Sequence, residues 1–485
     1  MTRKKRSGRK GREGRAERVP SRPAGEGVGD DAGVVNDRSD KLDSVGPSHH
    51  ALAKAILQRH FGRIRYCPEE RRFRLINKES GLWEPDVAGR LLRLGLDAAR
   101  HFVDQIQADD RKITRREVAR LTDPRTIEGA LRLIGSEPGV LTMRDEFDPD
   151  PYLLVVRNGV VKLMTGTLCS ARPEDLLTMA SRATFDPKAK CPRFQKFLDE
   201  TFEKDRDVID FVQRVVGYAL SGDTSEQAVF MFSGSGANGK STLINVFKAL
   251  AGTYCATARR ETFSTKRTAG GHTEDLARLA GKRSAVVHEM EGVVDEALLK
   301  EMTGGDDITA RALYRESFEF RPRFKLIFTS NALPRITSNS PSTWRRIRVV
   351  HFLHRVPESD QDGKLIDKLL DELPGILNWA IRGFQAWKQQ GLKVPEAVRR
   401  ATDEYRGQED VLGQFLEETC VKGAALETPT GYLYFRFVEW CKAAGVRALA
   451  GPQFNAQMIG QGFEYKRRKT GRFWLGLRPR HPGGE

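Results

Sequence analysis

The chain has 485 residues, of which 30% are charged and 39% apolar, and its net charge is +16. This length favours two to four domains, and the basic surplus favours a polyanionic partner. Six cysteines without a C-x-x-C pair argue against a zinc ribbon or a disulfide framework. No apolar run approaches the roughly 20 residues of a membrane span. No apolar stretch follows the charged N-terminus either, so we expect a cytoplasmic protein without membrane contact.

Residues 1–48 form a basic tail that is rich in Arg, Gly, Ser and Pro and almost free of large apolar residues. Such a composition cannot bury enough surface to order itself, which predicts disorder. Two interpretations of its charge stay open, namely non-specific contact with nucleic acid and a solubilising extension.

Residues 49–190 predict an α+β domain. Helical periodicity begins at Ala51, and "RRFRLINKESGLWEPD" (71–86) alternates on either side of a turn, as a hairpin does. The run "YLLVVRNGVVKLMTG" (152–166) predicts a second hairpin that turns at Asn158-Gly159. The run 185–194 predicts a linker. No catalytic constellation is found in this region.

Two predicted helices lead to an apolar strand, Ala228 to Phe232, and then to the glycine-rich run "GSGANGKST". This run matches G-x-x-x-x-G-K-[ST], in which glycines let backbone N–H groups surround a phosphate at the start of a helix. Lys240 would reach the β and γ oxygens of ATP, and the Ser241 hydroxyl would bind Mg²⁺. The predicted nucleotide-binding residues are Gly234, Ser235, Gly236, Ala237, Asn238, Gly239, Lys240, Ser241 and Thr242.

Polar side chains follow the next two apolar strands. In "RSAVVHEME" the acids Glu289 and Glu291 share one strand face while the extended conformation lasts, so one could hold magnesium and the other polarise water. Asn331, at the end of "FKLIFTSN", is placed to orient water against a γ-phosphate. "STWRRIRVV" then offers Arg345, Arg346 and Arg348 for charge that develops in phosphoryl transfer, with a solvated basic turn as the alternative.

The last region, 405–485, predicts helices at 409–418, 430–444 and 452–462, followed by two strands around a Lys-Thr-Gly turn. Aromatic residues interleave with the charges of this hairpin, which suits contact with DNA phosphates. A solvated basic hairpin is the alternative. The candidate DNA-binding residues here are Lys466, Arg467, Arg468, Lys469 and Arg472.

In order, "GSGANGKST", "VVHEME", "LLKEMTGGDDITARALYRESFEF", "FKLIFTSNALPRI" and "WRRIRVVHF" resemble the superfamily 3 helicases of phage and plasmid primase–helicases, which are related to the poxvirus primase–helicase. The resemblance covers most of residues 51–480. It implies an α/β fold with an AAA+-like P-loop ATPase core (191–400), a helicase-preceding α+β domain (49–190) and a C-terminal winged-helix domain (405–485). It also implies ATP and Mg²⁺ as cofactors.

By residue, the resemblance gives Lys240 and Ser241 the Walker A roles, Glu289 and Glu291 the Walker B roles, and Asn331 the sensor role. Arg345 or Arg346 resembles the arginine finger of a neighbouring subunit, which implies a ring, usually a homo-hexamer. The run 308–320 is similar to the hairpin that tracks one DNA strand in the channel. The DNA-binding candidates there are Lys300, Arg311, Tyr314 and Arg315.

The leading hypothesis is an ATP-dependent DNA helicase of a phage, prophage or plasmid in a bacterial cytoplasm. It would act on single-stranded and forked DNA, with a separate primase or other replication proteins as partners. One alternative is a primase or primase–helicase. However, no Asp-x-Asp strand is found, and the acidic run 144–152 is broken by prolines. The other alternative is an origin-binding initiator that uses ATP as an assembly switch.

Overall fold

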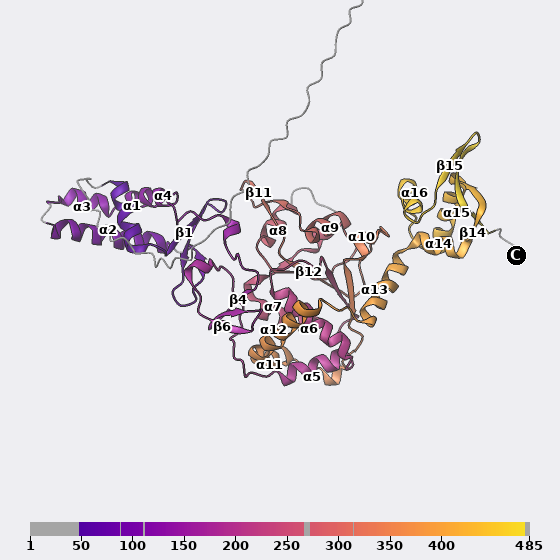
Figure 1. The fold of residues 1–485 in the computed structure, drawn as a ribbon, viewed down its shortest axis with the longest axis horizontal. Coiled ribbons are helices and arrows are strands. Elements are labelled where there is room, and N and C mark those ends of the chain that lie inside the picture. Colours follow the sequence, from indigo (N-terminus) through magenta and orange to yellow (C-terminus); the bar gives the residue numbers. More distant parts are fainter. Residues whose placement is uncertain (1–47, 88, 110–111, 266–271, 314, 481–485) are drawn as a thin grey trace, which may run out of the picture. The chain divides into compact units, whose positions relative to one another are not determined.

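The computed structural model describes residues 48–87, 89–109, 112–265, 272–313 and 315–480 (Figure 1). Almost all of the basic tail predicted to be disordered, and Tyr314, lie outside these residues. The described chain is a mixed α/β structure with one parallel sheet and several small antiparallel sheets. None of its helices is long and apolar enough to cross a membrane.

Four helices and a three-stranded sheet begin the described chain. Ser48 caps the first helix and Asp123 the fourth, each with its side-chain oxygen. Apolar faces of three of the helices pack together with Ile64 and Leu75 of the sheet. The elements are α1 (His49–His60), β1 (Ile64–Cys67), β2 (Arg72–Ile76), β3 (Trp83–Pro85), α2 (Arg90–Ala108), α3 (Arg115–Leu121) and α4 (Pro124–Ile134).

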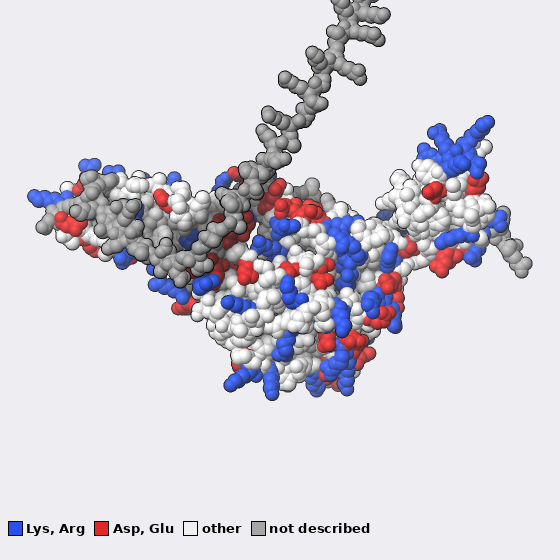
Figure 2. Space-filling model, in the orientation of Figure 1, with Lys and Arg blue, Asp and Glu red and all other residues white. Residues whose placement is uncertain are grey.

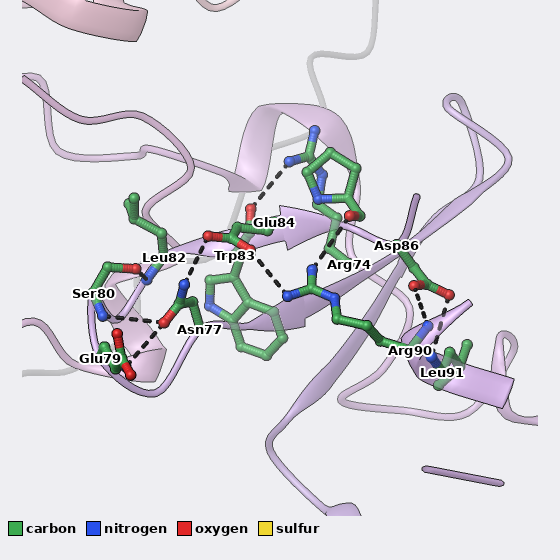
Figure 3. A network of polar contacts seen from close by, with 11 residues as sticks. Arg74, Asn77, Glu79, Ser80, Leu82, Trp83, Glu84, Asp86, Arg90 and Leu91 are labelled. Carbon is green, nitrogen blue, oxygen red and sulfur yellow. Dashed lines mark hydrogen bonds and ion pairs between the residues drawn. The ribbon is translucent and has the colours of Figure 1, made fainter. Parts of the chain in front are cut away.

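The predicted hairpin at 71–86 is confirmed, since β2 and β3 pair antiparallel. Its turn is closed by Asn77, whose Oδ1 accepts the backbone N–H of Glu79 at 2.9 Å (Figure 3). Glu84 accepts from the Asn77 amide at 2.9 Å and from the Arg90 guanidinium at 3.0 Å, which ties the hairpin to the start of α2.

A second antiparallel sheet contains β4 (Leu153–Val156), β5 (Gly159–Lys162) and β6 (Thr167–Cys169). Val156 lies opposite Gly159, so the two-residue turn is Arg157-Asn158, one residue earlier than predicted. The buried residues of β4 and β5 belong largely to the same core as the helices that follow. The run 185–194, predicted to be a linker, is bonded to a later helix, because the Asn378 amide donates to the carbonyls of Asp186 and Ala189.

The central sheet has five parallel strands in the order β13-β7-β12-β9-β8. Because the strands are parallel, their carboxyl ends meet at one edge, where polar side chains from distant parts of the sequence come together. The strands are β7 (Val229–Ser233), β8 (Cys255–Ala258), β9 (Ser284–Val287), β12 (Lys325–Ser330) and β13 (Ile347–His351).

Helices and one hairpin connect these strands. The hairpin pairs Ile308 with Phe320 and Arg311 with Ser317, as predicted for the run 308–320. The connecting elements are α7 (Lys240–Ala251), α8 (His272–Leu279), α9 (Glu296–Gly304), β10 (Ile308–Arg311), β11 (Ser317–Phe320) and α10 (Pro341–Trp344).

Helices α6 and α12 cross at unusually close range. A Cβ at Gly217 would lie 2.1 Å from the backbone nitrogen of Phe384, and one at Gly383 would lie 2.1 Å from the carbonyl oxygen of Gln213. Only glycine permits this backbone contact. The helices of this layer are α5 (Pro192–Thr201), α6 (Arg206–Leu220), α11 (Leu365–Asp371), α12 (Leu373–Gln390) and α13 (Glu396–Glu409).

The last region builds a small core around Phe415, Phe437, Phe454 and Trp474. The three predicted helices and two predicted strands are confirmed, and a further strand, β14, pairs with β16. The elements are α14 (Val411–Thr419), β14 (Cys420–Pro429), α15 (Thr430–Ala443), α16 (Gly451–Gly460), β15 (Tyr465–Arg468) and β16 (Gly471–Pro479).

Candidate functional site

The glycine-rich loop runs from the carboxyl end of β7 to the start of α7. Gly236, Ala237 and Gly239 have φ angles of +91°, +48° and +81°, in the left-handed region that glycine adopts at little cost. A Cβ at Gly239 would lie 2.8 Å from Oγ1 of Thr201, and one at Gly234 would lie 2.5 Å from the carbonyl oxygen of Phe352. The loop therefore curls tightly against α5 and against the segment after β13.

Asn238 holds this curl in place. Its side chain is only 4% exposed, and its amide donates to the carbonyl oxygen of Phe352 at 3.1 Å while its Oδ1 accepts the N–H of Lys240 at 3.3 Å. The N–H of Val356 donates to the carbonyl of Ala237 at 2.9 Å. The sequence placed Asn238 among the predicted nucleotide-binding residues but gave no sign of Phe352, its structural partner.

The inner side of the loop carries open donors. Within the described ranges, the N–H groups of Ala237, Asn238 and Gly239 donate no hydrogen bond, and the first turn of α7 adds unpaired N–H groups and a positive dipole end. Ser241 is exposed and Thr242 partly exposed at that turn. This donor set fits an anion of phosphate type.

Lys240 is the cation of this site. Its side chain is 6% exposed, and its ammonium donates to the carbonyl of Gly234 at 2.8 Å, to the carbonyl of Ser330 at 2.5 Å and to Oδ1 of Asn331 at 3.3 Å. Burial lowers the pKa of Lys240 from its ordinary value. Because none of these three acceptors carries a full charge, the ammonium can still neutralise a bound phosphate.

The acids after β9 are arranged differently from the prediction. β9 ends at Val287, and Glu289 has a φ angle of +50°. Extended alternation therefore stops before Glu291, so the prediction that the two acids share a strand face is wrong. The N–H of Met290 donates to the carbonyl of Thr329 at 2.9 Å, which keeps this segment beside the end of β12.

The two acids also differ in their partners. Glu291 lies 3.6 Å from the guanidinium of Arg260, in the short helix η4 (Arg260–Phe263). Glu289 is exposed and forms no ion pair within the described chain. In sheet register Val287 lies opposite Phe328, and Ser330 lies opposite Ser233. Glu289, Asn331 and the start of the loop therefore lie along one edge of the sheet.

A cleft of about 1280 Å³ opens beside the loop. Gly239, Ser241 and Thr242 line one side of it, and α5 and the segment 354–366 line much of the rest. Its wall includes the ring of Phe197 and the cations Arg193 and Lys196. A cleft of this size, next to open phosphate donors, can accommodate the nucleoside part of a nucleotide.

The three arginines at the start of β13, two before the strand and Arg348 within it, have separate environments. Arg346 is 7% exposed, and its guanidinium donates to Oγ1 of Thr303 at 3.0 Å and to the carbonyl of Ser342. Arg348 is half-buried and donates to nearby carbonyls. Arg345 is exposed and donates to Oε1 of Gln227 at 2.7 Å. Of the two predicted finger residues, Arg346 is buried and Arg345 is exposed.

The hairpin β10–β11 carries exposed Arg311 and partly exposed Arg315, and the Nε of Arg311 donates to the carbonyl of Arg315 at 2.9 Å. Lys300 lies on α9, which precedes the hairpin. Tyr314, predicted at the tip, lies outside the described residues. Leu313, next to it, is 62% exposed.

Basic side chains gather on the hairpin β15–β16 (Figure 2). Arg468 pairs with Glu427 of β14 at 2.6 Å, and Arg472 lies 5.6 Å from the ring centre of Tyr465. Trp474, predicted among the interleaved aromatics, is instead buried in the core at 1% exposure. The exposed candidates are Lys466, Arg467, Arg468, Lys469 and Arg472.

No group of three or more metal-binding His, Cys, Asp or Glu side chains is found in the described part of the chain. The acids of the run 144–152 serve its local fold. Glu146 accepts the N–H of Met143, and Asp148 accepts from Thr178.

Three families match parts of the chain. Residues 53–203 match the family described as D5 N terminal like, residues 232–346 match a family of unknown function, and residues 408–474 match the family described as Poxvirus D5 protein-like. D5-type domains thus occupy both the N-terminal and the C-terminal described regions.

Curated relatives from large DNA viruses carry helicase and primase names. "Putative helicase L207/L206" of Acanthamoeba polyphaga mimivirus is 28% identical over 338 residues, which is 64% of this chain and 35% of the relative. "Putative helicase 022R" of Frog virus 3 is 26% identical over 388 residues, 62% of this chain and 39% of the relative. A "Putative primase" of African swine fever virus is 23% identical over 307 residues, 58% of this chain and 32% of the relative.

The chain thus spans between 32% and 39% of the length of these relatives. None of the three comes from a phage or a plasmid, so the predicted bacterial host stays a prediction. Among solved structures, the A form apo structure of the NrS-1 C terminal region has a TM-score of 0.49 at 10% identity, covering 90% of this chain and 100% of that chain.

Proposed function

We propose that this chain, with D5-type domains at both ends, is an ATP-dependent DNA helicase of a replication system. The proposal takes the central region as an AAA+-like P-loop ATPase core of the superfamily 3 type and residues 405–485 as a winged-helix domain. The observation that carries it is the Lys240 ammonium, bonded only to uncharged oxygens beneath open N–H groups at the carboxyl edge of a parallel sheet.

ATP with Mg²⁺ would supply the phosphoryl group whose hydrolysis drives movement. On the protein side, Lys240 and the N–H groups of Ala237 to Gly239 would hold the phosphates. Ser241 and Glu289 would hold the metal, because both are exposed near the same edge and Glu289 forms no ion pair with another described residue. Asn331 would orient water, since its side chain already contacts Lys240.

A ring is supported by the position of Arg345. It precedes β13, whereas the glycine-rich loop follows β7, and β13 is parallel to β7 over five residues. Arg345 and the loop of the same subunit are therefore separated by roughly 16 Å of strand. An exposed arginine at the opposite edge is suited to the phosphate of a neighbouring subunit, as a homo-hexamer would require.

Single-stranded DNA is the proposed track. Arg311 and Arg315 on β10–β11, and the basic hairpin β15–β16, offer cations for backbone phosphates without a fixed base sequence. Binding through such contacts weakens steeply as salt rises.

The test is forked-duplex unwinding and DNA-stimulated ATP hydrolysis by the full chain, beside Lys240→Ala and the control Lys248→Ala. Lys248 lies on the same helix, but its ammonium bonds Thr257 at 2.9 Å, away from the loop. We expect Lys240→Ala to lose both activities by about 100-fold or more and Lys248→Ala to retain them. Hydrolysis without strand separation would instead favour the initiator that uses ATP as a switch.

The primase name of some relatives keeps a second function open. Primer synthesis on a single-stranded template by this chain alone, unaffected by Lys240→Ala, would favour it over the helicase.

A further inference from the structure

A second pocket lies at the opposite edge of the central sheet from the glycine-rich loop. It has a volume of about 400 Å³. Arg283 directly precedes β9 and Arg323 lies two residues before β12, so the pocket is at the amino ends of these strands. β2 and the turn at 147–151 contribute other walls. None of the predicted nucleotide-binding residues lines it.

Hydrogen bonds join the walls of this pocket. The N–H of Trp83 in β3 donates to the carbonyl of Leu177 at 2.8 Å, and the N–H of Asp148 donates to the carbonyl of Leu176 at 3.1 Å. Arg323 donates to the carbonyl of Asp148 at 3.1 Å. The pocket is thus built from bonded elements rather than from loose neighbours.

Cations outnumber acids along its lining. The five cations are Arg74, Arg144, Lys282, Arg283 and Arg323, and the two acids are Glu70 and Asp148. Glu70 is already occupied, because Nη2 of Arg74 donates to both of its oxygens at 3.0 and 2.9 Å. The carboxylate of Asp148 is also hydrogen-bonded, since its two oxygens accept from the N–H and the hydroxyl of Thr178.

Three lining cations, Lys282, Arg283 and Arg323, therefore have no ion-pair partner in the described chain. Arg283 donates to the carbonyls of Leu220 and Asp150. Lys282 donates only to the carbonyl of Thr253, at 2.8 Å, and burial lowers its pKa from the ordinary value. Arg323 donates only to the carbonyl of Asp148. The carboxylate of Asp148 compensates part of the charge of Lys282. The lining still has more cations than acids, and a bound anion would offset that surplus.

Two arginines of the lining also have buried donors without acceptors. The Nε of Arg74 and Nη1 of Arg144 are buried and have no hydrogen-bond partner. The guanidinium carbon of Arg144 lies over the ring of Phe318 in β11, 3.7 Å from the ring centre. Figure 3 shows Arg74 donating to the carbonyl of Trp83 with its other arm, at 3.2 Å. Buried unpaired donors are rare in folded proteins, and these two belong to arginines of the pocket lining.

We propose that this pocket binds a phosphate group, separate from the nucleotide held by the glycine-rich loop. Arginine and lysine donors around a small open pocket match the shape and charge of phosphate. The phosphate can belong to the backbone of a DNA strand, because the hairpin β10–β11 is joined to the pocket through Phe318, or to a free phosphate compound.

The experiment compares Arg323→Gln and Lys282→Gln with the control Arg321→Gln, in the full chain. Glutamine at 323 keeps a donor for the carbonyl of Asp148. Arg321 is exposed, two residues from Arg323, and does not line the pocket. Thermal unfolding checks that each variant is folded. Two pocket variants are used so that the test still holds if one of them does not fold.

The first probe is pyrophosphate, titrated calorimetrically in the Lys240→Ala background so that the glycine-rich loop contributes little. The second is a single-stranded oligothymidylate, titrated at several salt concentrations. We expect each pocket variant to weaken pyrophosphate binding about tenfold and the control to leave it unchanged. Oligonucleotide affinity should fall as well, with the salt slope reduced by about one.

If the pocket variants lose binding of both probes, the phosphate belongs to a DNA strand. If they lose binding of pyrophosphate alone, the phosphate belongs to a free compound. Equal affinities of all three variants for both probes overturn the proposal. Neither probe requires ATP turnover, so a failed unwinding assay leaves this inference standing.

Discussion

Lys240 and Asn331, which are 91 positions apart, are in direct contact, with the ammonium of Lys240 3.3 Å from Oδ1 of Asn331. The contact joins the first turn of α7 to the end of β12 across neighbouring strands of the central sheet. A side chain proposed to sense the nucleotide is therefore already bonded to the cation proposed to hold its phosphate.

Substitution of Arg345 should affect ATP hydrolysis, whereas substitution of Arg346 should affect stability. Arg345→Ala should abolish most ATP hydrolysis and keep the melting temperature, because its guanidinium is exposed. Arg346→Ala should destabilise the fold by about 2 kcal/mol, because Thr303 and Ser342 lose a buried charged donor. Calorimetric unfolding and a hydrolysis assay measure the two effects.

A mixture tests whether Arg345 acts on a neighbour. Equal amounts of Lys240→Ala and Arg345→Ala subunits form some interfaces with both residues intact. Such a mixture should hydrolyse ATP faster than either variant alone, and no gain would place Arg345 outside the site.

Asn238→Ala should weaken nucleotide binding without unfolding the chain. It removes the bond to the carbonyl of Phe352 and the acceptor for the N–H of Lys240, so the loop loses its fixed curl. We expect the affinity for MgATP to fall about tenfold, as measured by titration of a fluorescent analogue. Asn455→Ala, an exposed asparagine on α16, is the control, and equal affinities would contradict the role of Asn238.

Gly217→Ala should destabilise the protein by about 3 kcal/mol, because the added Cβ meets the backbone of α12, which cannot rotate away. Gly407→Ala is the matched control in helix α13, where a Cβ meets nothing within 4 Å. It should be neutral or stabilise by up to about 1 kcal/mol. Denaturant unfolding measures both, and similar losses would argue against the close crossing.

The buried ammonium group of Lys325 should make the free energy of unfolding depend on pH. Full burial lowers its pKa well below the ordinary value of 10.5. Between the lowered and the ordinary pKa the unfolded chain binds more protons than the folded one. The free energy of unfolding should therefore rise with pH in that window, by at most about 1.4 kcal/mol per pH unit.

The measurement is urea unfolding between pH 7 and 10. Lys325→Met should reduce the slope. Lys388→Met should leave the slope of stability against pH nearly unchanged. A hydrogen bond to Tyr152 raises the pKa of Lys388, so the stability that Lys388 contributes is lost only as pH rises through that higher pKa. An unaltered slope in Lys325→Met would refute the assignment.

Elements with strong local signals were predictable from the sequence. The hairpins at 71–86 and 308–320 have turn residues between alternating runs, and the C-terminal helices have clear periodicity. β14 was missed because "CVKGAALETP" has a glycine, poor alternation and a register shift between Lys422 and Glu427.

Parts of the site depend on contacts that no local pattern carries. The partner of Asn238 is a backbone carbonyl, which any residue at 352 would offer. The left-handed conformation of Glu289 follows from how the chain leaves β9, so the alternation rule failed there. Arg346 is buried because it bonds Thr303 of α9. The local sequence "WRRIR" carries no sign of that contact and does not distinguish its three arginines.

The strand order has a consequence for synthesis of the protein. The hydrogen-bond partner of Asn238 is Phe352, which is synthesised 114 residues later. Strand β7 likewise has no partner until its two neighbours, β12 and β13, have been synthesised. A ribosome-bound chain ending before β13 therefore carries the whole glycine-rich run but not its support. Because such distant pairing is slow, nascent chains should gain nucleotide binding only after the last strand of the sheet has emerged.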